Sequence, residues 1–345
     1  MADKHLVRFE PVGIEIEVEE HQTILRAAAE QGIMLMHGCK EGQCSSCKSF
    51  VLDGDDIELD RYSTFALPDA ERDEGYTLLC RAHVYEDVTI ELLNYDEDMI
   101  RSGLPIQQAV AEVVANDLVT HDMRHLVLHL IEPQEVTFFP GQYMDIAVPG
   151  TEATRSFSMA NTSTREAGQL EFVIKVYPDG LFSHFLATQL AVGDRLDLVG
   201  PFGVFTLREG HDADLLFVGG GAGMAPILSL LRSMAERGID RSATFYYGAR
   251  GSRDLCFADE LRALEHRLPR FRYVPALSED HWDGEVGLIT DVVATHEKDL
   301  SGTDAYVCGP PPMVEAAIDL LSRLGIEKDR IYYDKFTTTG DPDGP

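Results

Sequence analysis

The 345-residue sequence predicts a multidomain protein in which a small α+β unit, an antiparallel β-barrel and a parallel α/β sheet follow one another. Three observations lead to this prediction. Four of the six cysteines lie within the first 80 residues, short strand-like segments recur between about 108 and 208, and strand-like segments alternate with helix-like ones from 213 onward. A chain of this length also exceeds a single ordinary core of about 100 to 200 residues.

Composition is that of a soluble globular protein, with 44% hydrophobic and 26% charged residues. No apolar run approaches the roughly 18 to 20 residues needed to span a bilayer, and the N-terminus lacks a secretory h-region, so we expect no membrane association and a cytoplasmic location. The net charge is -30, of which residues 1–100 contribute -15. Such a surface repels nucleic acid, so it is either a solvated face or a docking face for a basic protein.

The first segment contains one hairpin and one helix. Alternation in IEIEVEE after the PVG turn predicts a hairpin over residues 5–20, and TILRAAAEQG predicts a short helix that ends at Gly32. Another alternating strand, VTIELL, follows Cys80. The charged stretch NYDEDMIRSGLPIQQ predicts a linker, with a boundary near residue 104.

The cysteines of this segment have the spacing of metal-cluster ligands. Cys39, Cys44 and Cys47 are separated by four and two residues, and Cys80 follows after 32 more, which is the plant-type pattern for a 2Fe-2S cluster. Four thiolates around such a cluster leave negative charge that backbone N–H groups must offset, and the glycines and serines of HGCKEGQCSSCK let the backbone wrap closely. The alternatives are a zinc site, which usually shows two paired knuckles, and ordinary buried thiols.

The middle segment predicts a small barrel, and the last segment predicts βαβ units. Strand-like runs in the middle are AVAEVVA, RHLVLHLI, YMDIAVPG, RSFSMA, LEFVIKVY and RLDLVG, with one helical run, LFSHFLATQL. The last segment pairs LLFVGG with the helix APILSLLRSMAERG, TFYYGA with a helix near 257–267, and AYVCGP with MVEAAIDLLSRLG.

The first hundred residues resemble a plant-type ferredoxin domain, which implies a β-grasp fold. In the middle segment, Arg155, Ser156, Phe157 and Ser158 resemble the R-x-Y-S motif of the ferredoxin reductase superfamily. The resemblance implies that Arg155 pairs with a flavin phosphate, that Phe157 lies against the flavin ring, and that Ser158 binds near its reactive nitrogen. Phe157 lacks the hydroxyl of the more frequent tyrosine.

Two further stretches match the same superfamily and imply FAD. VIKV contains Ile174, Lys175 and Val176, and DGLFS places Gly180 and Ser183 at a helix start, where backbone donors suit a pyrophosphate. The alternative for Ser183 is a plain N-cap. PFG at 201–203 resembles the turn that ends the family's flavin domain.

The last segment resembles the superfamily's nicotinamide domain. A strand runs into a glycine-rich turn of the form G-x-G-x-x-P, and the residues we expect to bind NADH there are Gly220, Gly221, Gly223, Met224 and Pro226. The C-G-P-P motif implies that Cys308, Gly309 and Pro310 lie beside the nicotinamide, and the terminal YDKF segment implies that Phe336 lies near the flavin. Without that context, Cys308 reads as a small buried hydrophobe and Phe336 as core. Cys256 is expected to be structural.

The resemblance spans about residues 5 to 337, with domains at 1–100, 105–208 and 211–337. The chain is similar to the reductase components of bacterial multicomponent di-iron monooxygenases, and within them to the propane monooxygenase reductases. This implies an NADH-dependent oxidoreductase in which electrons pass from NADH to FAD, to the cluster and to a hydroxylase partner. The catalytic residues would be Ser158, Cys308 and Phe336. One alternative is the reductase of another oxygenase system, either a methane, alkene or phenol monooxygenase or a Rieske aromatic-ring dioxygenase, whose reductases share every motif. A pure electron carrier and a zinc-binding module are further alternatives.

The choice between NADH and NADPH depends on the residues after TFYYGA. Arg250, Ser252 and Arg253 offer donors to a 2'-phosphate, but this strand also ends without the acidic residue that often binds the ribose. The family resemblance favours NADH.

Overall fold

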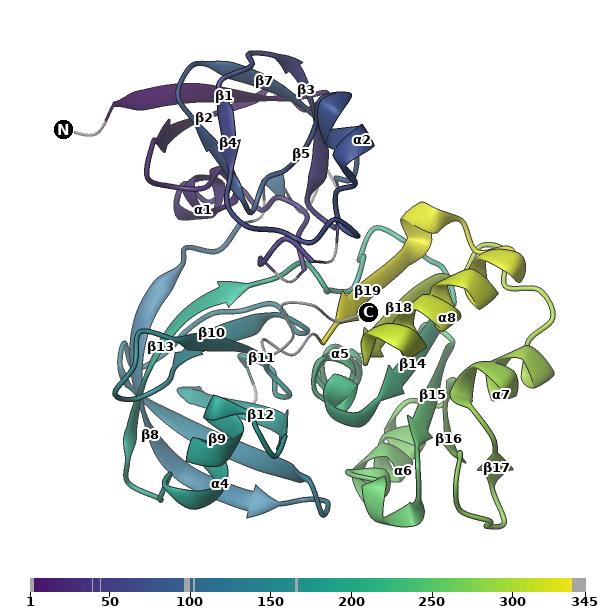
Figure 1. Ribbon diagram of the computed structural model, residues 1–345. Coiled ribbons are helices and arrows are strands. Elements are labelled where there is room, and N and C mark those ends of the chain that lie inside the picture. The colour runs from purple at the N-terminus through teal and green to yellow at the C-terminus, as the bar shows by residue number, and fades with distance from the viewer. Residues whose placement is uncertain are drawn as a thin grey trace. The chain divides into compact units, whose positions relative to one another are not determined.

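The chain divides into two compact units, Met1–Ile106 and Gln107–Pro345, in the computed structural model (Figure 1). The structure describes residues 3–38, 40–43, 45–95, 100–101, 103–164 and 167–336. No helix in this described part is both long and apolar enough to cross a membrane.

The first unit is a β-grasp sheet with the strand order β2-β1-β7-β3-β5, beside a two-stranded sheet of β4 and β6. The alternation predicted for β2 is confirmed, because Ile14, Ile16 and Val18 are buried while the glutamates between them are exposed. The helix α1 begins after Thr23, whose Oγ1 accepts the N–H of Arg26 at 3.4 Å. Its elements are β1 (Lys4–Glu10), β2 (Ile14–Glu19), α1 (Ile24–Glu30), β3 (Lys48–Asp53), β4 (Ile57–Leu59), α2 (Asp69–Asp73), β5 (Tyr76–Leu78), β6 (Ala82–Val84) and β7 (Val88–Leu92).

The described part of the predicted linker is packed against the first unit. Ile100 is 1% exposed in the core of that unit, and its carbonyl accepts the N–H of Met34 at 3.1 Å. A Cβ on Gly103 would lie 2.1 Å from the carbonyl oxygen of Gly32. The charge of this stretch predicts a linker, and a single isoleucine within it is too weak a pattern to predict that it packs into the core.

The second unit begins with a six-stranded antiparallel barrel in the order β11-β10-β13-β8-β9-β12. It closes where Met159 bridges Phe172 and the N–H of Ala160 donates to the Glu171 carbonyl at 2.7 Å. Phe182 and Leu186 of α4 pack into the barrel core. The elements are β8 (Gln107–Leu118), β9 (Met123–Glu132), β10 (Tyr143–Ala147), β11 (Thr154–Ser158), β12 (Gln169–Lys175), α4 (Leu181–Thr188) and β13 (Arg195–Phe202).

A parallel sheet in the order β17-β16-β15-β14-β18-β19 completes the second unit. Every residue of β14 and β18 is buried, because α5 and α6 cover one face while α7 and α8 cover the other (Figure 1). The elements are β14 (Leu215–Gly220), η1 (Gly221–Gly223), α5 (Met224–Arg237), β15 (Ala243–Ala249), η2 (Ser252–Asp254), α6 (Ala258–Arg267), β16 (Phe271–Leu277), β17 (Glu285–Val286), α7 (Ile289–His296), β18 (Asp304–Gly309), α8 (Pro311–Arg323), η3 (Lys328–Arg330) and β19 (Ile331–Lys335).

The connectivity of this sheet creates a switch point between β14 and β18. From β14 the chain moves to β15 and β16 on one side, and it later returns to β18 and β19 on the other. Ligands of open α/β sheets bind at the carboxyl ends of the strands on either side of such a point. The barrel and the sheet share one core here, in which Met123 and Val173 join Met224 and Ile227.

Candidate cofactor-binding sites

Strand pairing in the first unit brings two of the predicted cluster ligands together. Cys47 directly precedes β3 and Cys80 follows β5, and these strands pair antiparallel with Lys48 opposite Leu78. The N–H of Leu79 donates to the Cys47 carbonyl at 3.2 Å, and both cysteines are 4% exposed. Cys39 and Cys44 lie outside the described residues. The described part of the chain therefore offers two buried cysteines at the end of one strand pair.

The loop before Cys47 wraps tightly enough to surround a bound group. Lys40 and Ser45 have φ angles of 57° and 62°, which are unusual outside glycine. A Cβ on Gly42 would lie 2.7 Å from the Cβ of Tyr62, so only glycine fits there. The Gly42 carbonyl accepts the N–H of Ser63 at 3.0 Å. This close backbone fits the cluster that the cysteine spacing predicts.

Phe65 lies on the segment that supports this loop, and sequence reasoning missed it. The Ser45 hydroxyl donates to the Ala66 carbonyl at 3.0 Å, next to Phe65. Phe65 is 78% exposed, more than any other large hydrophobic residue in the described part of the chain. In the sequence, Phe65 is only an aromatic residue in a turn-rich stretch. The structure makes it a candidate for contact with a partner protein beside the cysteine loop.

The strand β11 presents the predicted flavin motif on the wall of the barrel. Arg155 and Phe157 are half-buried on one side of the strand, and the Phe157 ring lies 4.8 Å from that of Phe182 in α4. The Arg155 guanidinium donates one hydrogen bond to the Thr154 carbonyl at 2.7 Å and pairs with no described carboxylate, so its remaining donors suit a phosphate. Ser158 is 6% exposed and Ser156 donates to the Asp145 carboxylate at 2.5 Å. The roles expected of these residues remain predictions.

The start of α4 has free backbone donors, as a pyrophosphate site requires. Gly180 occupies the N-cap position and no side chain caps the helix. Ser183 is not the cap, because its hydroxyl oxygen accepts the N–H of Tyr177 at 3.0 Å. A Cβ on Gly180 would lie 2.8 Å from that oxygen, so the turn needs glycine. The helix start therefore fits the phosphate-binding role expected of it.

The residues of the VIKV stretch, which are expected to contact the flavin, make contacts within the protein. Ile174 is 1% exposed in the barrel core, and the Lys175 ammonium pairs with the Asp122 carboxylate at 2.5 Å. The N–H of Val176 donates to the Asp122 carbonyl at 2.8 Å. Flavin contacts by these three residues remain a prediction, and the Lys175 charge is already balanced within the protein.

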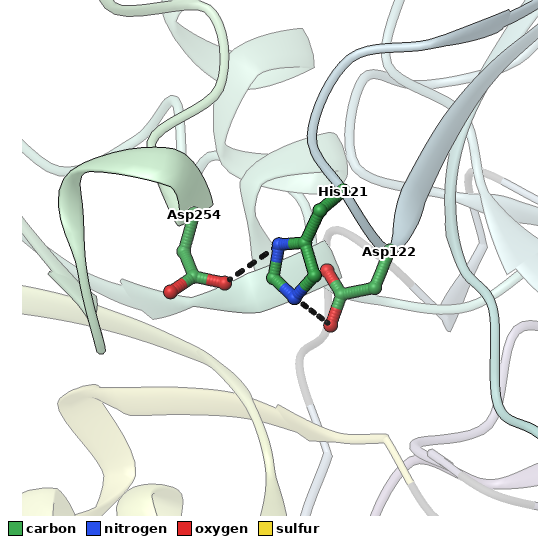
Figure 2. A group of neighbouring side chains, drawn as sticks. All are labelled: His121, Asp122 and Asp254. Atoms are coloured by element: carbon green, nitrogen blue, oxygen red, sulfur yellow. Dashed lines mark ion pairs between the residues drawn. The ribbon is translucent and has the colours of Figure 1, made fainter.

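Asp122 also belongs to a polar group that joins the barrel to the sheet. Figure 2 shows His121 between two carboxylates: its Nε2 lies 3.6 Å from Asp122 and its Nδ1 lies 3.4 Å from Asp254. This donor set resembles a metal site. We assign it no metal, because Lys175 and Arg250 already supply cations to Asp122.

The glycine-rich turn after β14 fits a dinucleotide. Gly221 has a φ angle of 56° and nothing within 4 Å of an added Cβ, so the chain turns here beside open space. A Cβ on Gly223 would lie 2.1 Å from the Cys308 carbonyl oxygen, which forces glycine where the turn meets β18. The helix α5 then begins at Met224 without a side-chain cap, and Pro226 in its first turn has no N–H to leave unpaired.

The neighbouring strand end brings the other residues that are expected beside the nicotinamide to the same edge of the sheet. Cys308 is fully buried, and burial together with the charge of Asp334 raises the pKa of its thiol well above the usual value. The Gly309 carbonyl accepts the N–H of Phe336 at 2.9 Å, and Pro310 occupies the N-cap position of α8. The Cys308 thiol is therefore neutral, and it can serve as an uncharged surface beside a ring but not as a nucleophile.

The described structure supports the structural interpretation of Cys256. The Cys256 Sγ lies 3.4 Å from the Tyr247 hydroxyl, and the residue is 2% exposed. Burial raises the pKa of this thiol to about 11. Cys256 therefore behaves as a buried hydrophobe.

A buried ion pair that the sequence did not reveal links α5 to the barrel. Arg232 donates to Glu171 of β12 at 2.9 Å and to the Ala160 carbonyl at 3.0 Å, and its remaining donors bind Glu260 of α6 at 2.7 and 2.9 Å. Burial alone would raise the pKa of Glu171, but the hydrogen bond from His125 and the charge of Arg232 lower it to about 2. The helix that starts at the glycine turn is thus fixed to the strand that ends in VIKV.

Comparison with known families agrees with this arrangement. Residues 7–85 match the 2Fe-2S iron-sulfur cluster binding domain, residues 110–207 the oxidoreductase FAD-binding domain, and residues 217–319 the oxidoreductase NAD-binding domain. The three matches occur in the order that the sequence motifs predicted.

Several known proteins resemble the chain over essentially its whole length. The chain is 52% identical to the reductase component of propane 2-monooxygenase from Mycolicibacterium smegmatis, over 98% of this chain and 99% of the relative. It is 36% identical to the phenol 2-monooxygenase reductase component DmpP of Pseudomonas sp. strain CF600, over 98% and 96%. The crystal structure of the Amycolatopsis cytochrome P450 reductase GcoB is 31% identical, with a TM-score of 0.86, over 96% and 99%. The chain therefore belongs to the family of oxygenase reductases that carry a 2Fe-2S cluster, FAD and NAD in three consecutive domains, and it is an NADH-dependent oxidoreductase.

Proposed function

We propose that the chain is the reductase of a propane-oxidising multicomponent di-iron monooxygenase and delivers electrons from NADH to its hydroxylase in the cytoplasm. The observation that carries this proposal is 52% identity to a propane 2-monooxygenase reductase along essentially the full length of both chains. When bound, FAD accepts electrons from NADH in pairs and the 2Fe-2S cluster passes them on singly, which converts a two-electron donor into a one-electron supply.

The residues of the chain bind and orient these groups. In this proposal Cys39, Cys44, Cys47 and Cys80 hold the cluster. Arg155 and the start of α4 neutralise the flavin phosphates, while Phe157 and Ser158 position the ring. The turn from Gly220 to Gly223 receives the NADH pyrophosphate, and Cys308 and Phe336 enclose the nicotinamide and flavin from the switch point. The neutral thiol and the aromatic ring exclude water from the reacting faces.

The accepting oxygenase is the part of the proposal that the fold does not determine. The Amycolatopsis relative is a cytochrome P450 reductase, so one architecture supplies different oxygenases. The test is electron transfer from NADH through this protein to purified hydroxylases of propane and phenol monooxygenases. We expect the propane hydroxylase to be reduced at least tenfold faster. Equal or faster reduction of the phenol hydroxylase would overturn the assignment to propane.

We further propose that the partner docks on the acidic first unit, because residues 1–100 carry a net charge of -15 and contain the cluster cysteines. The Debye length falls from about 30 Å at 0.01 M salt to about 10 Å at 0.1 M, so partner reduction should slow across that range while flavin reduction by NADH stays constant. A partner reaction that is flat or faster with salt would show that docking is chiefly apolar. In that case Phe65→Ala should slow the reduction of the partner more than the increase in salt does.

A further inference from the structure

Two connections lie side by side at the carboxyl edge of the parallel sheet, one after β15 and one after β16. The N–H of Ser278 donates to the Ala249 carbonyl at 3.0 Å, and the N–H of Glu279 donates to the Arg250 carbonyl at 2.8 Å. These bonds fix the second connection against the first. They also bring the acidic residues after β16 next to the turn in which sequence analysis found donors for a phosphate.

Asp280 occupies the donors of that turn. Its Oδ2 accepts the backbone N–H of Ser252 at 2.7 Å and the Ser252 hydroxyl at 3.1 Å. A Cβ on Gly251 would lie 2.7 Å from the same oxygen, so the carboxylate packs directly on the backbone. No described residue donates to the other oxygen, Oδ1, and the side chain is exposed. Asp280 thus presents a charged acceptor at the edge of the sheet.

One of the two arginines of this turn, Arg250, is already paired with protein carboxylates. The guanidinium of Arg250 lies 3.4 Å from Asp122 and 3.6 Å from Asp254, the two carboxylates on either side of His121 in Figure 2. Arg250 is therefore directed toward protein carboxylates and not toward a ligand phosphate. Of the three donors that the sequence offers for a 2'-phosphate, Arg250 and Ser252 therefore bind aspartates. The third, Arg253, lies close enough to Asp280 that its charge, after the hydrogen bonds from Ser252, helps to lower the pKa of that carboxyl.

The sheet topology places the adenosine half of NADH over this edge. The nicotinamide has to reach Cys308 and Phe336, which lie at the ends of β18 and β19 on one side of the switch point. The pyrophosphate crosses the glycine turn after β14, so the adenosine extends to the opposite side, over β15 and β16. The strand β15 ends in Gly248 and Ala249, without the acidic residue that usually binds the adenosine ribose.

We propose that Asp280 supplies this missing carboxylate and makes the reductase select NADH over NADPH. Its Oδ1 accepts a hydrogen bond from the 2'-hydroxyl of the adenosine ribose, and its charge repels the 2'-phosphate of NADPH. The proposal deepens the NADH-dependent function proposed above and rests on it. The carboxylate is fixed for this task, because both donors of Ser252 hold the side chain in one orientation.

The experiment compares Asp280→Asn with a matched control. In the control, Asp299→Asn, the parent carboxylate also accepts the N–H and hydroxyl of a serine, Ser301, at 2.9 and 2.6 Å, but it lies before β18 and away from the carboxyl edge. We would measure kcat/KM for NADH and for NADPH with ferricyanide as acceptor. The NADPH/NADH ratio should rise at least tenfold, about 1.4 kcal/mol, in Asp280→Asn and stay within twofold of the parent in Asp299→Asn.

A distorted turn would lower both kcat/KM values together and leave the ratio unchanged, so the ratio isolates recognition from folding. A ratio within twofold of the parent in Asp280→Asn would overturn the proposal, as would a larger rise in the neighbouring variant Glu279→Gln. Calorimetric binding of 2',5'-ADP and 5'-ADP tests Asp280 without turnover, and only the 2'-phosphorylated ligand should gain affinity. Failure of the parent protein to oxidise NADH at all would instead contradict the proposed function.

Discussion

Replacing Arg232 by methionine should destabilise the flavin-bearing unit far more than replacing another arginine of the same helix. Arg232 is 5% exposed, and its loss leaves the Glu171 carboxylate, itself 13% exposed, without its cation. The environment lowers the pKa of Glu171 from 4.5 to about 2, which corresponds to roughly 3 kcal/mol of the free energy of unfolding at neutral pH. Breaking a buried pair costs a similar amount, about 3 to 5 kcal/mol.

The stability lost in Arg232→Met should depend on pH in a direction that the pKa of Glu171 predicts. A lowered folded-state pKa stabilises the protein above the unfolded value of 4.5, and that contribution is lost as the pH falls toward 2. In Arg232→Met the carboxylate stays buried without the guanidinium, so its pKa rises and the group becomes neutral on acidification. The stability difference between the parent protein and Arg232→Met should therefore be largest near pH 7 and should narrow by pH 4.

The assay is urea unfolding followed by flavin fluorescence, which reports the second unit alone. The matched control is Arg237→Met, in which the lost arginine lies on the same helix but pairs with Glu209 at the surface, where the two side chains are 48% and 58% exposed. We expect a loss of less than about 1 kcal/mol from this change, with little pH dependence. A loss in Arg232→Met no larger than in Arg237→Met, or one that does not change with pH, would refute the reasoning.

Three further variants separate the sites from one another. Cys47→Ser should abolish the electron paramagnetic resonance signal of the reduced cluster while NADH still reduces ferricyanide. Loss of ferricyanide reduction as well would contradict the independence of the cluster site from the flavin and NADH sites. Cys256→Ala should keep the cluster signal and NADH oxidation, because the buried neutral thiol has no role in either, and a tenfold loss of kcat would assign it one. Gly223→Ala should raise the KM for NADH at least tenfold, since the new Cβ meets the Cys308 carbonyl at 2.1 Å. Gly238→Ala at the far end of α5 lowers stability, because Gly238 has a φ angle of 65°, but its Cβ meets no atom within 4 Å and KM should stay unchanged.

The parts of the fold with a strong local pattern were predictable from the sequence. The alternation in β2, the buried runs of β14 and β18, and the helices that follow them were all expected and are confirmed. The strands β4, β5 and β6 were missed because three residues are too few to show a period of two. Ile100 was missed because a single apolar residue in a charged stretch does not indicate a core contact.

The residues that sequence reasoning missed at the sites depend on long-range pairing. Asp280 lies 28 residues from Ser252, and it reaches that turn only because β15 and β16 are neighbours in the sheet. Arg232 and Glu171 are 61 residues apart, and neither stands in a recognisable motif. Sequence spacing reveals ligands that one loop or one turn supplies, whereas contacts between strand ends follow from strand order.

The position of Arg232 has a consequence for how the two cofactors are aligned. The helix α5 begins at the glycine turn, and Arg232 in its third turn binds the barrel through Glu171 and the Ala160 carbonyl. The Ser229 hydroxyl, one turn earlier on the helix, donates to the Asn161 carbonyl at 2.5 Å. The contacts therefore lie at the beginning of β12 and beside it. The same strand ends at Lys175, in the stretch that is expected to contact flavin. One helix therefore fixes the glycine turn, which is expected to bind the NADH pyrophosphate, relative to the barrel. Because hydride transfer depends on the distance between the two rings, kcat should respond to changes in α5 contacts that touch neither cofactor.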